Sequence, residues 1–354
     1  MLKQKRILLL GCGGSAGINF VKALRLAREK LYIVGIDKNK YYLELSPANK
    51  RYLVDHKPGE EKEYINKIIK IIKKEKIDFV HAQPDPEVKI LSDYREQIPV
   101  NTFLPSKSAV DISQDKWKTY EQLRKHNVPV ADTIQVKNVE SLKKKFQNNR
   151  EVLWIRASRG AGGKASLPVK SFEQAKVWIE YWLERGLEWS DFLVNEYLPG
   201  KEVSWLSIWK NGKLICSQQK ERVEWVQAGI SPSGVTGTTA IQKTVQYPNV
   251  NQICTAAVLA VDNDPNGIFV VDVKENKRGI PCVTEINPGR FFTTSLFFAT
   301  AGINMPKIFV DLGLNSKIKK IKKYNSVPSN VYWIRVTDGG PVMIKNNSWT
   351  SQKI

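Results

Sequence analysis

Short apolar runs alternate with amphipathic stretches over the first 82 residues. Arg6–Leu10, Tyr32–Asp37 and Ile77–Ala82 are apolar segments of strand length, and such runs predict buried β-strands. Between them, residues 18–30 and 60–76 place apolar side chains at helical spacing, and glutamates open the second stretch while lysines close it. This β-α-β-α-β order predicts an α/β unit with a parallel sheet and helices on both faces.

The pattern changes after about residue 113. Ser113 can cap a helix that runs to about His126. Further strands are expected at 152–155, 192–197, 203–210, 213–219, 268–274, 281–286 and 331–336, and further helices at 172–184 and 249–261. Asn211-Gly212 separates two of these strands and is a strong hairpin signal. Strands mixed with helices and a hairpin predict an α+β body.

The charge balance bears on the class of ligand. The 354 residues carry a net charge of +20, and 41 of the 55 basic residues are lysines. Nucleic-acid recognition favours arginine forks with interleaved aromatics, which the chain does not display, so a nucleic-acid partner is the less favoured interpretation. An anionic small substrate accounts for the charge at least as well. The basic run Lys317–Lys323 is left without an assigned role.

The cysteines, the histidines and the length of the apolar runs argue against several classes of protein. The four cysteines are far apart without a C-x-x-C pair, and the three histidines form no cluster, which argues against a disulfide scaffold or a zinc site. No apolar run approaches the ~18 residues of a membrane span. The apolar core after Lys3, Lys5 and Arg6 is four residues long, shorter than the ~7 residues of a signal peptide. We therefore expect a cytoplasmic protein without a membrane partner.

Two glycine-rich loops resemble phosphate-binding motifs. Gly11-x-Gly13-x-x-Ala16 follows a strand and precedes a helix, with Asp37 ending the next strand, as in dinucleotide-binding proteins. This leaves an NAD-dependent oxidoreductase as an alternative, although the same loop could hold a carboxylate or phosphate. The second loop, residues 158–165, fails as a Walker A motif because Ser158 replaces its first glycine and Ala165 its Ser/Thr. A flexible flap over phosphates fits this second loop better.

Two acidic residues interrupt apolar strands further along the chain. Asp272 lies in Val270-Val271-Asp272-Val273, and Glu285 begins the cluster Glu285-Ile286-Asn287-Pro288-Gly289-Arg290. A carboxylate in an apolar strand is costly unless it is paired or bound to a metal. Two such carboxylates with an amide form a hard oxygen-ligand site suited to Mg²⁺.

Together with the second glycine loop and the segment Phe192–Glu202, this cluster resembles the ATP-grasp ligases. The resemblance is to the carboxylate–amine ligase type, similar to one synthetase unit of the carbamoyl-phosphate synthetase large chain, and it runs from Lys5 to about Pro306. It implies a Rossmann-like domain at 1–112, a lid subdomain at 113–198 and a C-terminal α+β body with the metal site at 199–315. A strand and tail at 316–354 complete the expected division.

The resemblance also assigns site residues. It assigns ATP binding to Lys116, Arg156, Gly160, Gly162, Gly163, Lys164, Glu196, Tyr197, Leu198 and Glu202. It assigns the metal, Mg²⁺ or Mn²⁺, to Asp272, Glu285 and Asn287, and phosphoryl transfer to Arg156 and Arg290. Within the ATP set, residues 196–198 would contact adenine, Glu202 the ribose and the glycine loop the phosphates. Gly13, Gly14, Ser15 and Arg222 are expected to contact the substrate.

The implied activity is ATP-dependent joining of a carboxylate to an amine through an acyl phosphate, with release of ADP and phosphate. A carbamate or carboxylate kinase of the same fold stays open as an alternative. The implied partners are small carboxylate and amine substrates, and a homodimer is an assembly that the resemblance allows. Gly289 is an extra residue before Arg290 relative to the family pattern, and Asp272 stands where some relatives carry Gln.

Overall fold

The N-terminal part of the computed structural model is a parallel four-stranded sheet. The structure describes residues 4–147, 149–160, 162–336 and 340–344. The sheet has the order β3-β2-β1-β4, formed by β1 (Arg6–Leu10), β2 (Tyr32–Asp37), β3 (Lys50–Leu53) and β4 (Phe79–Ala82). Its helices are α1 (Ser15–Arg25), α2 (Lys40–Glu44), α3 (Glu61–Glu75) and α4 (Asp85–Asp93), followed by the short 3₁₀ turn η1 (Arg95–Gln97).

The apolar pattern explains this unit. Residues 7–10 of β1 are fully buried because helices cover both faces of the sheet. Ile65, Ile68 and Ile72 of α3 pack on one face, as their helical spacing predicts. The prediction omitted α2 and β3, since the polar β3 lies at the sheet edge and is largely exposed.

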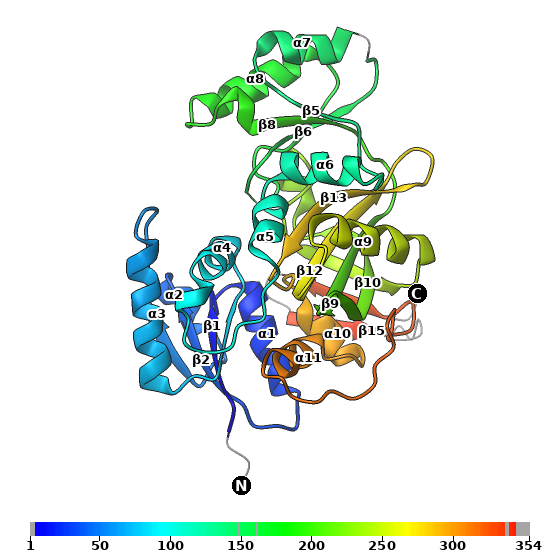
Figure 1. Cartoon of the computed structure of the whole chain (residues 1–354). Helices are drawn as coiled ribbons and strands as arrows, with labels where there is room; N and C mark the ends of the chain where they lie inside the picture. Colours follow the sequence, from blue (N-terminus) through cyan, green and yellow to red (C-terminus); the bar gives the residue numbers. More distant parts are fainter. Residues whose placement is uncertain (1–3, 148, 161, 337–339, 345–354) are drawn as a thin grey trace.

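Two helices lead into a second, antiparallel sheet. They are α5 (Lys107–Ser113) and α6 (Lys116–Lys125). The predicted single helix from Ser113 is wrong in its start: Ser113 ends α5, and the Asp115 side chain caps α6 by accepting hydrogen bonds from the backbone of Trp117 and Lys118. The sheet order is β5-β8-β6-β7, from β5 (Thr133–Gln135), β6 (Leu153–Ala157), β7 (Leu167–Val169) and β8 (Phe192–Glu196). Helices α7 (Val139–Gln147) and α8 (Phe172–Leu183) cover it, with η2 (Trp189–Asp191) before β8 (Figure 1).

The third sheet has seven strands in the order β13-β12-β9-β10-β11-β14-β15. They are β9 (Glu202–Lys210), β10 (Lys213–Trp225), β11 (Thr239–Val245), β12 (Gly267–Glu275), β13 (Pro281–Pro288), β14 (Tyr332–Val336) and β15 (Gly340–Ile344). The predicted hairpin turn at Asn211-Gly212 is present, with φ of +50° and +71° at its two residues. The helices of this part are η3 (Ala228–Ile230), α9 (Pro248–Val261), α10 (Ser295–Ala301) and α11 (Met305–Gly313).

Alternation along β9 gives the seven-stranded sheet two different faces. Val203 and Trp205 face α9, where they join an apolar core with Val271 and Val273. The opposite face carries Ser204 and Leu206, and Leu206 continues into the apolar core with α10, α11 and α1 of the N-terminal unit. The end of that second face that carries Ser204 points toward the four-stranded sheet β5-β8-β6-β7.

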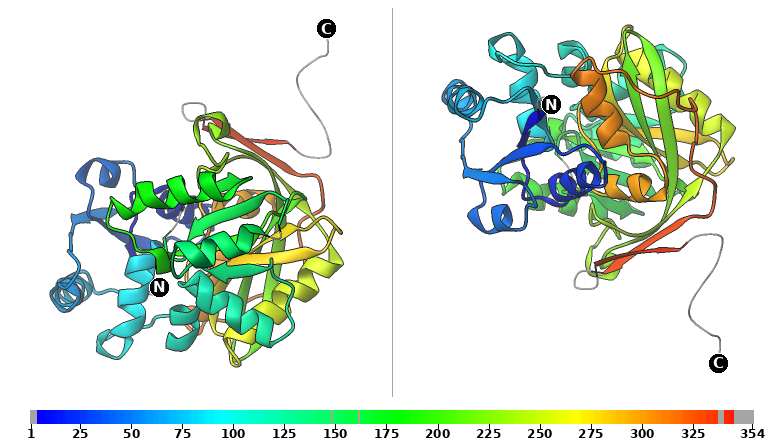
Figure 2. Two further views of the ribbon diagram at one scale, coloured as in Figure 1. Left: turned by 90° about the horizontal axis from the view of Figure 1, so that it is seen from above. Right: turned by 90° about the horizontal axis from the view of Figure 1, so that it is seen from below.

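The three sheets meet around one central region. Figure 1 shows the β5–β8 sheet with α7 and α8 above the seven-stranded sheet, and the N-terminal unit beside it. Figure 2 shows from above and below that the N-terminal unit packs along one flank of this sheet. The lysine-rich 317–323 segment is irregular, with Ile318 and Ile321 packed on the core and its lysines exposed. Across the described residues, no helix combines the length and apolarity that a membrane span requires.

Candidate active site

A cavity of about 510 Å³ lies between the β5–β8 sheet and the polar end of the seven-stranded sheet. This volume is in the range of small-molecule and cofactor sites. The cavity brings together most of the predicted site residues: Lys116, Arg156, Gly160, Gly162, Gly163, Lys164, Glu196, Tyr197, Leu198, Glu202, Arg222, Asp272, Glu285, Asn287 and Arg290. They come from six strands, the first residue of α6 and three loops, so the cavity is a property of the tertiary fold.

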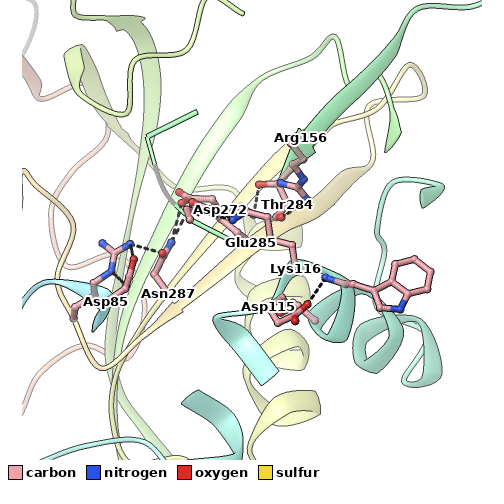
Figure 3. A network of polar contacts seen from close by, with 12 residues as sticks. Asp85, Asp115, Lys116, Arg156, Asp272, Thr284, Glu285 and Asn287 are labelled. Carbon is pink, nitrogen blue, oxygen red and sulfur yellow. Dashed lines mark hydrogen bonds and ion pairs between the residues drawn. The ribbon is translucent and has the colours of Figure 1, made fainter. Parts of the chain in front are cut away.

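The two strand carboxylates lie directly opposite each other. Asp272 on β12 pairs with Glu285 on β13, and Val270 pairs with Asn287. The Asn287 amide nitrogen donates toward both carboxylates, at 3.4 Å from Asp272 Oδ2 and 3.3 Å from Glu285 Oε1. Figure 3 shows these three side chains converging above the paired strands. The antiparallel register is therefore the feature that places both acids at one point.

The two acids have opposite electrostatic surroundings. Burial, and then the negative charge of Glu285, raises the pKa of Asp272. Burial opposes the ionisation of Glu285 as well, but the charges of Lys116, Arg156 and Arg290 outweigh it and lower the Glu285 pKa to about 2. Lys116 Nζ lies 3.8 Å from Glu285 Oε2. Glu285 is thus held as an anion, whereas Asp272 lacks a comparable set of cations.

This arrangement fits a divalent cation completed by phosphate oxygens. Among the described residues, no group of three or more His, Cys, Asp or Glu side chains could hold a metal by itself. Two carboxylates and an amide are nevertheless enough protein ligands for a Mg²⁺ site, because Mg²⁺ in phosphate-transfer sites takes its remaining ligands from phosphates and water. A cation there would also relieve the repulsion between Asp272 and Glu285.

Three glycines of the second glycine loop have positive φ angles. Gly160, Gly162 and Gly163 have φ of +97°, +73° and +73°, a region that other residues enter only with strain. Lys116 Nζ donates to the Gly160 carbonyl at 2.8 Å, which ties the start of α6 to the loop. The Lys164 ammonium lies 5.5 Å from the centre of the Trp182 ring.

Arg156 has a buried donor without a partner. Its Nη2 donates to the Thr284 carbonyl at 2.9 Å, as Figure 3 shows. Its Nε is buried and has no hydrogen-bond partner among the described residues. An unpaired buried donor is costly, so Arg156 is suited to an anionic ligand in the cavity.

The opposite end of the cavity is more apolar. Trp154, Tyr197 and Leu198 line it together with Val130 and Ala131. Glu196 is the last residue of β8, and Tyr197 and Leu198 follow it directly. An apolar lining beside a carboxylate and backbone groups suits a planar heterocycle with an amino group.

Arg222 and Glu202 form an ion pair across β9 and β10. The two residues are in register, and the Arg222 guanidinium contacts the Glu202 carboxylate. Arg222 Nε also donates to Thr239 Oγ1 at 3.0 Å, and its guanidinium carbon lies 3.6 Å from the centre of the Trp225 ring. Arg222, which was expected to contact the substrate, therefore contacts Glu202, which was expected to contact the ribose.

Arg290 has a partner that the sequence interpretation missed. It forms a two-pronged ion pair with Asp85, at the start of α4 in the N-terminal unit, and its Nη2 donates to Asn287 Oδ1 at 2.5 Å. Figure 3 shows Asp85 beside Asn287. Asp85 follows β4 directly, and the carboxyl end of a parallel strand is where α/β sheets present functional side chains. The position of Asp85 just after a predicted parallel strand was the feature of the sequence that could have identified it as a site residue.

The N-terminal loop is not part of the cavity. Gly13, Gly14 and Ser15 do not line it. The Gly13 N–H donates to Asp37 Oδ2 at 2.8 Å, and a Cβ on Gly13 would lie 2.6 Å from the Tyr42 backbone. The loop is thus packed against α2, and the Asp37 carboxylate that a dinucleotide would need accepts from the loop itself. Helix α1 does reach the cavity wall, where Asn19 donates to the Thr293 carbonyl.

Comparison with known proteins identifies the relatives of this chain. A family model for the ATP-grasp domain matches residues 113–294. The carbamoyl phosphate synthase large chain of Clostridium acetobutylicum is 24% identical over 338 residues, which is 90% of this chain and 30% of that protein. The phosphoribosylamine–glycine ligase of Escherichia coli is 24% identical over 233 residues, which is 60% of this chain and 53% of that protein. The chain thus spans only a third to a half of these curated relatives.

Solved structures share the fold. N5-carboxyaminoimidazole synthetase from Staphylococcus aureus complexed with ADP superposes with a TM-score of 0.70 at 15% identity, covering 95% of this chain and 83% of that one. The L-amino acid ligase from Bacillus licheniformis gives a TM-score of 0.70 at 11% identity, covering 94% and 79%. At this identity the likeness establishes the fold alone.

Proposed function

Since this chain belongs to the ATP-grasp family, we propose that it is an ATP-dependent ligase that joins a carboxylate to an amine and releases ADP and phosphate. The observation that carries the proposal is the convergence in one cavity of two in-register carboxylates, a glycine loop and three cations around Glu285. The relatives named phosphoribosylamine–glycine ligase and L-amino acid ligase are carbon–nitrogen ligases by name, which supports the same class.

The proposed reaction has two steps. A carboxylate oxygen of the substrate attacks the γ-phosphorus of ATP, and the bond to the β-phosphate oxygen breaks to leave ADP and an acyl phosphate. The amine nitrogen then attacks the acyl carbon, inorganic phosphate leaves, and the nitrogen loses a proton. Neither step needs a protein nucleophile, so catalysis is positioning and charge neutralisation.

Named side chains would perform these tasks. Arg156 and Arg290 neutralise phosphate charge on either side of Glu285, and Lys116 holds the start of the glycine loop. The closed glycine loop excludes water, which would otherwise hydrolyse the acyl phosphate. Glu196, Tyr197 and Leu198 take the adenine. Asp272, Glu285 and Asn287 would hold Mg²⁺, which supplies neutralisation of phosphate oxygens when it is bound.

The division of labour proposed for the chain follows its three sheets. Residues 1–112 would present the substrate, 113–198 form the lid over ATP, and 199–315 carry the metal and phosphoryl-transfer residues. Within 316–354, β14 extends the seven-stranded sheet by pairing with β11, and β15 pairs with β14.

An ADP-release screen tests the proposal. The full chain is incubated with Mg-ATP and a panel of carboxylic acids, with and without amines, and products are identified by mass spectrometry. Asp272→Asn serves as the background control. We expect ADP release that depends on one acid and one amine. Release with the acid alone and a stable phosphorylated product would instead establish a kinase, and failure to bind Mg-ATP would refute both.

A further inference from the structure

A fully buried lysine lies in the same sheet row as the proposed metal ligands. Asp272 pairs with Ser204 on β9, and Ser204 pairs with Lys220 on β10. Residues paired across neighbouring strands point to the same face of a sheet, so Lys220 and Asp272 share the cavity face. Two strand spacings separate them, about 10 Å between their backbones. Lys220 lines the cavity and is 3% exposed.

The protein surrounds the Lys220 ammonium with neutral groups. Nζ donates to Gln242 Oε1 at 2.7 Å and to Thr294 Oγ1 at 3.1 Å. It lies 4.0 Å from the centre of the Phe292 ring. Throughout the described part of the chain, no carboxylate lies within ion-pair distance of it. An ammonium has three N–H donors, so one donor is left for a ligand.

A second polar group beside Lys220 also has an unpaired hydrogen-bond donor. The Gln242 amide nitrogen is buried and has no hydrogen-bond partner among the described residues. A buried cation without a counter-ion is costly, and an apolar side chain of similar volume would be cheaper for the fold. Consistent with this, burial lowers the pKa of Lys220 to about 7. The negative charge of Asp272 opposes this shift, and the positive charge of Arg335 adds to it. These features point to an anion that arrives with the substrate.

We propose that Lys220, held in place by Gln242 and Thr294, provides a subsite for a second, non-reacting anionic group of the substrate, a carboxylate or a phosphate. The proposal rests on the proposed ligase function. The reacting carboxylate would lie at the metal ligands, and the second anion would lie two strands away along the row through Ser204. Phe292 and Thr293 line the cavity beside Lys220 and would cover this anion.

The test compares matched anions in the presence of saturating Mg-ADP. Thermal unfolding of the full chain is followed at constant ionic strength with succinate against butyrate, and with 3-phosphoglycerate against glycerate. The variants are Lys220→Met and the smaller-change Lys220→Gln. Lys213→Met, at the exposed start of the same strand, is the matched control for loss of a positive charge.

We expect the member of at least one pair that carries the additional anionic group to raise the Tm of the wild type and of Lys213→Met by about 2 °C or more over its partner. This advantage should vanish in Lys220→Met and Lys220→Gln. The pair that shows the effect identifies the anion as carboxylate or phosphate.

Three outcomes would overturn the subsite. The first is that the additional anionic group gives the wild type no increase in Tm over the partner compound. The second is an equal increase in Tm in the Lys220 variants. The third is failure of both variants to fold, which would make Lys220 a structural residue. Mg-ADP itself should stabilise every folded variant. Its failure to do so in the wild type would refute the proposed nucleotide site instead.

Discussion

Asp272 and Glu285 are chemically similar neighbours with opposite environments. Burial and the Glu285 charge raise the pKa of Asp272, whereas three cations lower that of Glu285 to about 2 despite its burial. Removing the Glu285 charge therefore leaves buried cations without compensation, while removing the Asp272 charge relieves repulsion.

We predict that Glu285→Gln and Asp272→Asn each lower turnover by 100-fold or more, because each removes a charged oxygen ligand from the phosphoryl-transfer site. The two should differ in stability. Glu285→Gln should lower the Tm, and Asp272→Asn should keep or raise it. ADP release and thermal unfolding of the same preparations measure both effects. Full turnover in Asp272→Asn would remove it from the proposed metal site.

His81 is a buried neutral group in the N-terminal core. Its ring packs against Phe20, Phe291 and Phe309, and neither ring nitrogen has a hydrogen-bond partner among the described residues. Burial lowers its pKa to about 3. Between pH 6.5 and pH 3 the unfolded chain therefore binds a proton that the folded chain does not, so stability falls as the pH falls through this window.

We predict that His81 alone costs about 2 kcal/mol of unfolding free energy between pH 7 and pH 5. Guanidinium chloride unfolding of the wild type and His81→Leu at both pH values checks this. The variant should lose some packing at both pH values but show a pH dependence smaller by about that amount. Equal pH dependence in the two proteins would mean that His81 is protonated in the fold.

At the scale of elements, two loops meet over the cavity. Thr236 and Gly237 follow η3 in the segment 226–238, which connects β10 to β11. A Cβ on Gly237 would lie 2.7 Å from the Gly162 Cα, and one on Gly163 would lie 3.1 Å from the Val235 carbonyl. The second glycine loop thus packs backbone to backbone on this segment.

We predict that Gly237→Ala weakens Mg-ADP binding about tenfold or more by pushing the flap outward. Gly234→Ala is the matched control, because both glycines have φ near +71° but a Cβ on Gly234 meets nothing within 4 Å. Both variants carry the same backbone strain of about 1 kcal/mol. Titration calorimetry with Mg-ADP measures the difference. Equal affinities in the two variants would show that the contact does not hold the flap.

At the scale of the whole molecule, the N-terminal unit holds the segment that follows β13. Asp85 pairs with Arg290, Gln83 Oε1 accepts from the Phe291 N–H at 3.1 Å, and Asn19 donates to the Thr293 carbonyl. Three contacts from different elements therefore fix one short stretch that carries Arg290 and lines the cavity. The N-terminal unit in this way positions Arg290, the residue proposed to neutralise phosphate charge.

We predict that Asp85→Asn lowers kcat by about 10- to 100-fold with a smaller change in the KM for ATP, since Arg290 loses its orienting partner. Asp93→Asn, at the other end of α4 and paired with Lys89 and Lys107, is the control and should keep near-normal kcat. Steady-state kinetics with the acid found in the screen measure this. A kcat that Asp85→Asn leaves unchanged would show that Arg290 is positioned from within its own sheet.

Local signals in the sequence were sufficient for much of this molecule. The buried strand at residues 7–10, the isoleucine face of α3 and the turn at Asn211-Gly212 depend on side-chain period and turn chemistry within a few residues. The Glu285–Arg290 cluster and the glycine loop were recognisable for the same reason. The start of α6 was misplaced because Ser113 and Asp115 are both good caps, and packing against the rest of the fold selected Asp115.

Non-local pairing decided the rest. The row from Asp272 through Ser204 to Lys220 depends on the strand order β12-β9-β10, in which β9 and β12 are separated by more than fifty residues of chain. The Asp85–Arg290 pair spans 205 residues, and the Glu202–Arg222 pair depends on hairpin register. Sequence periodicity tells which face of a strand is buried but carries no record of which strand lies beside it. The sequence by itself therefore determined many of the elements and the family motifs, and only the tertiary structure decided which charges meet.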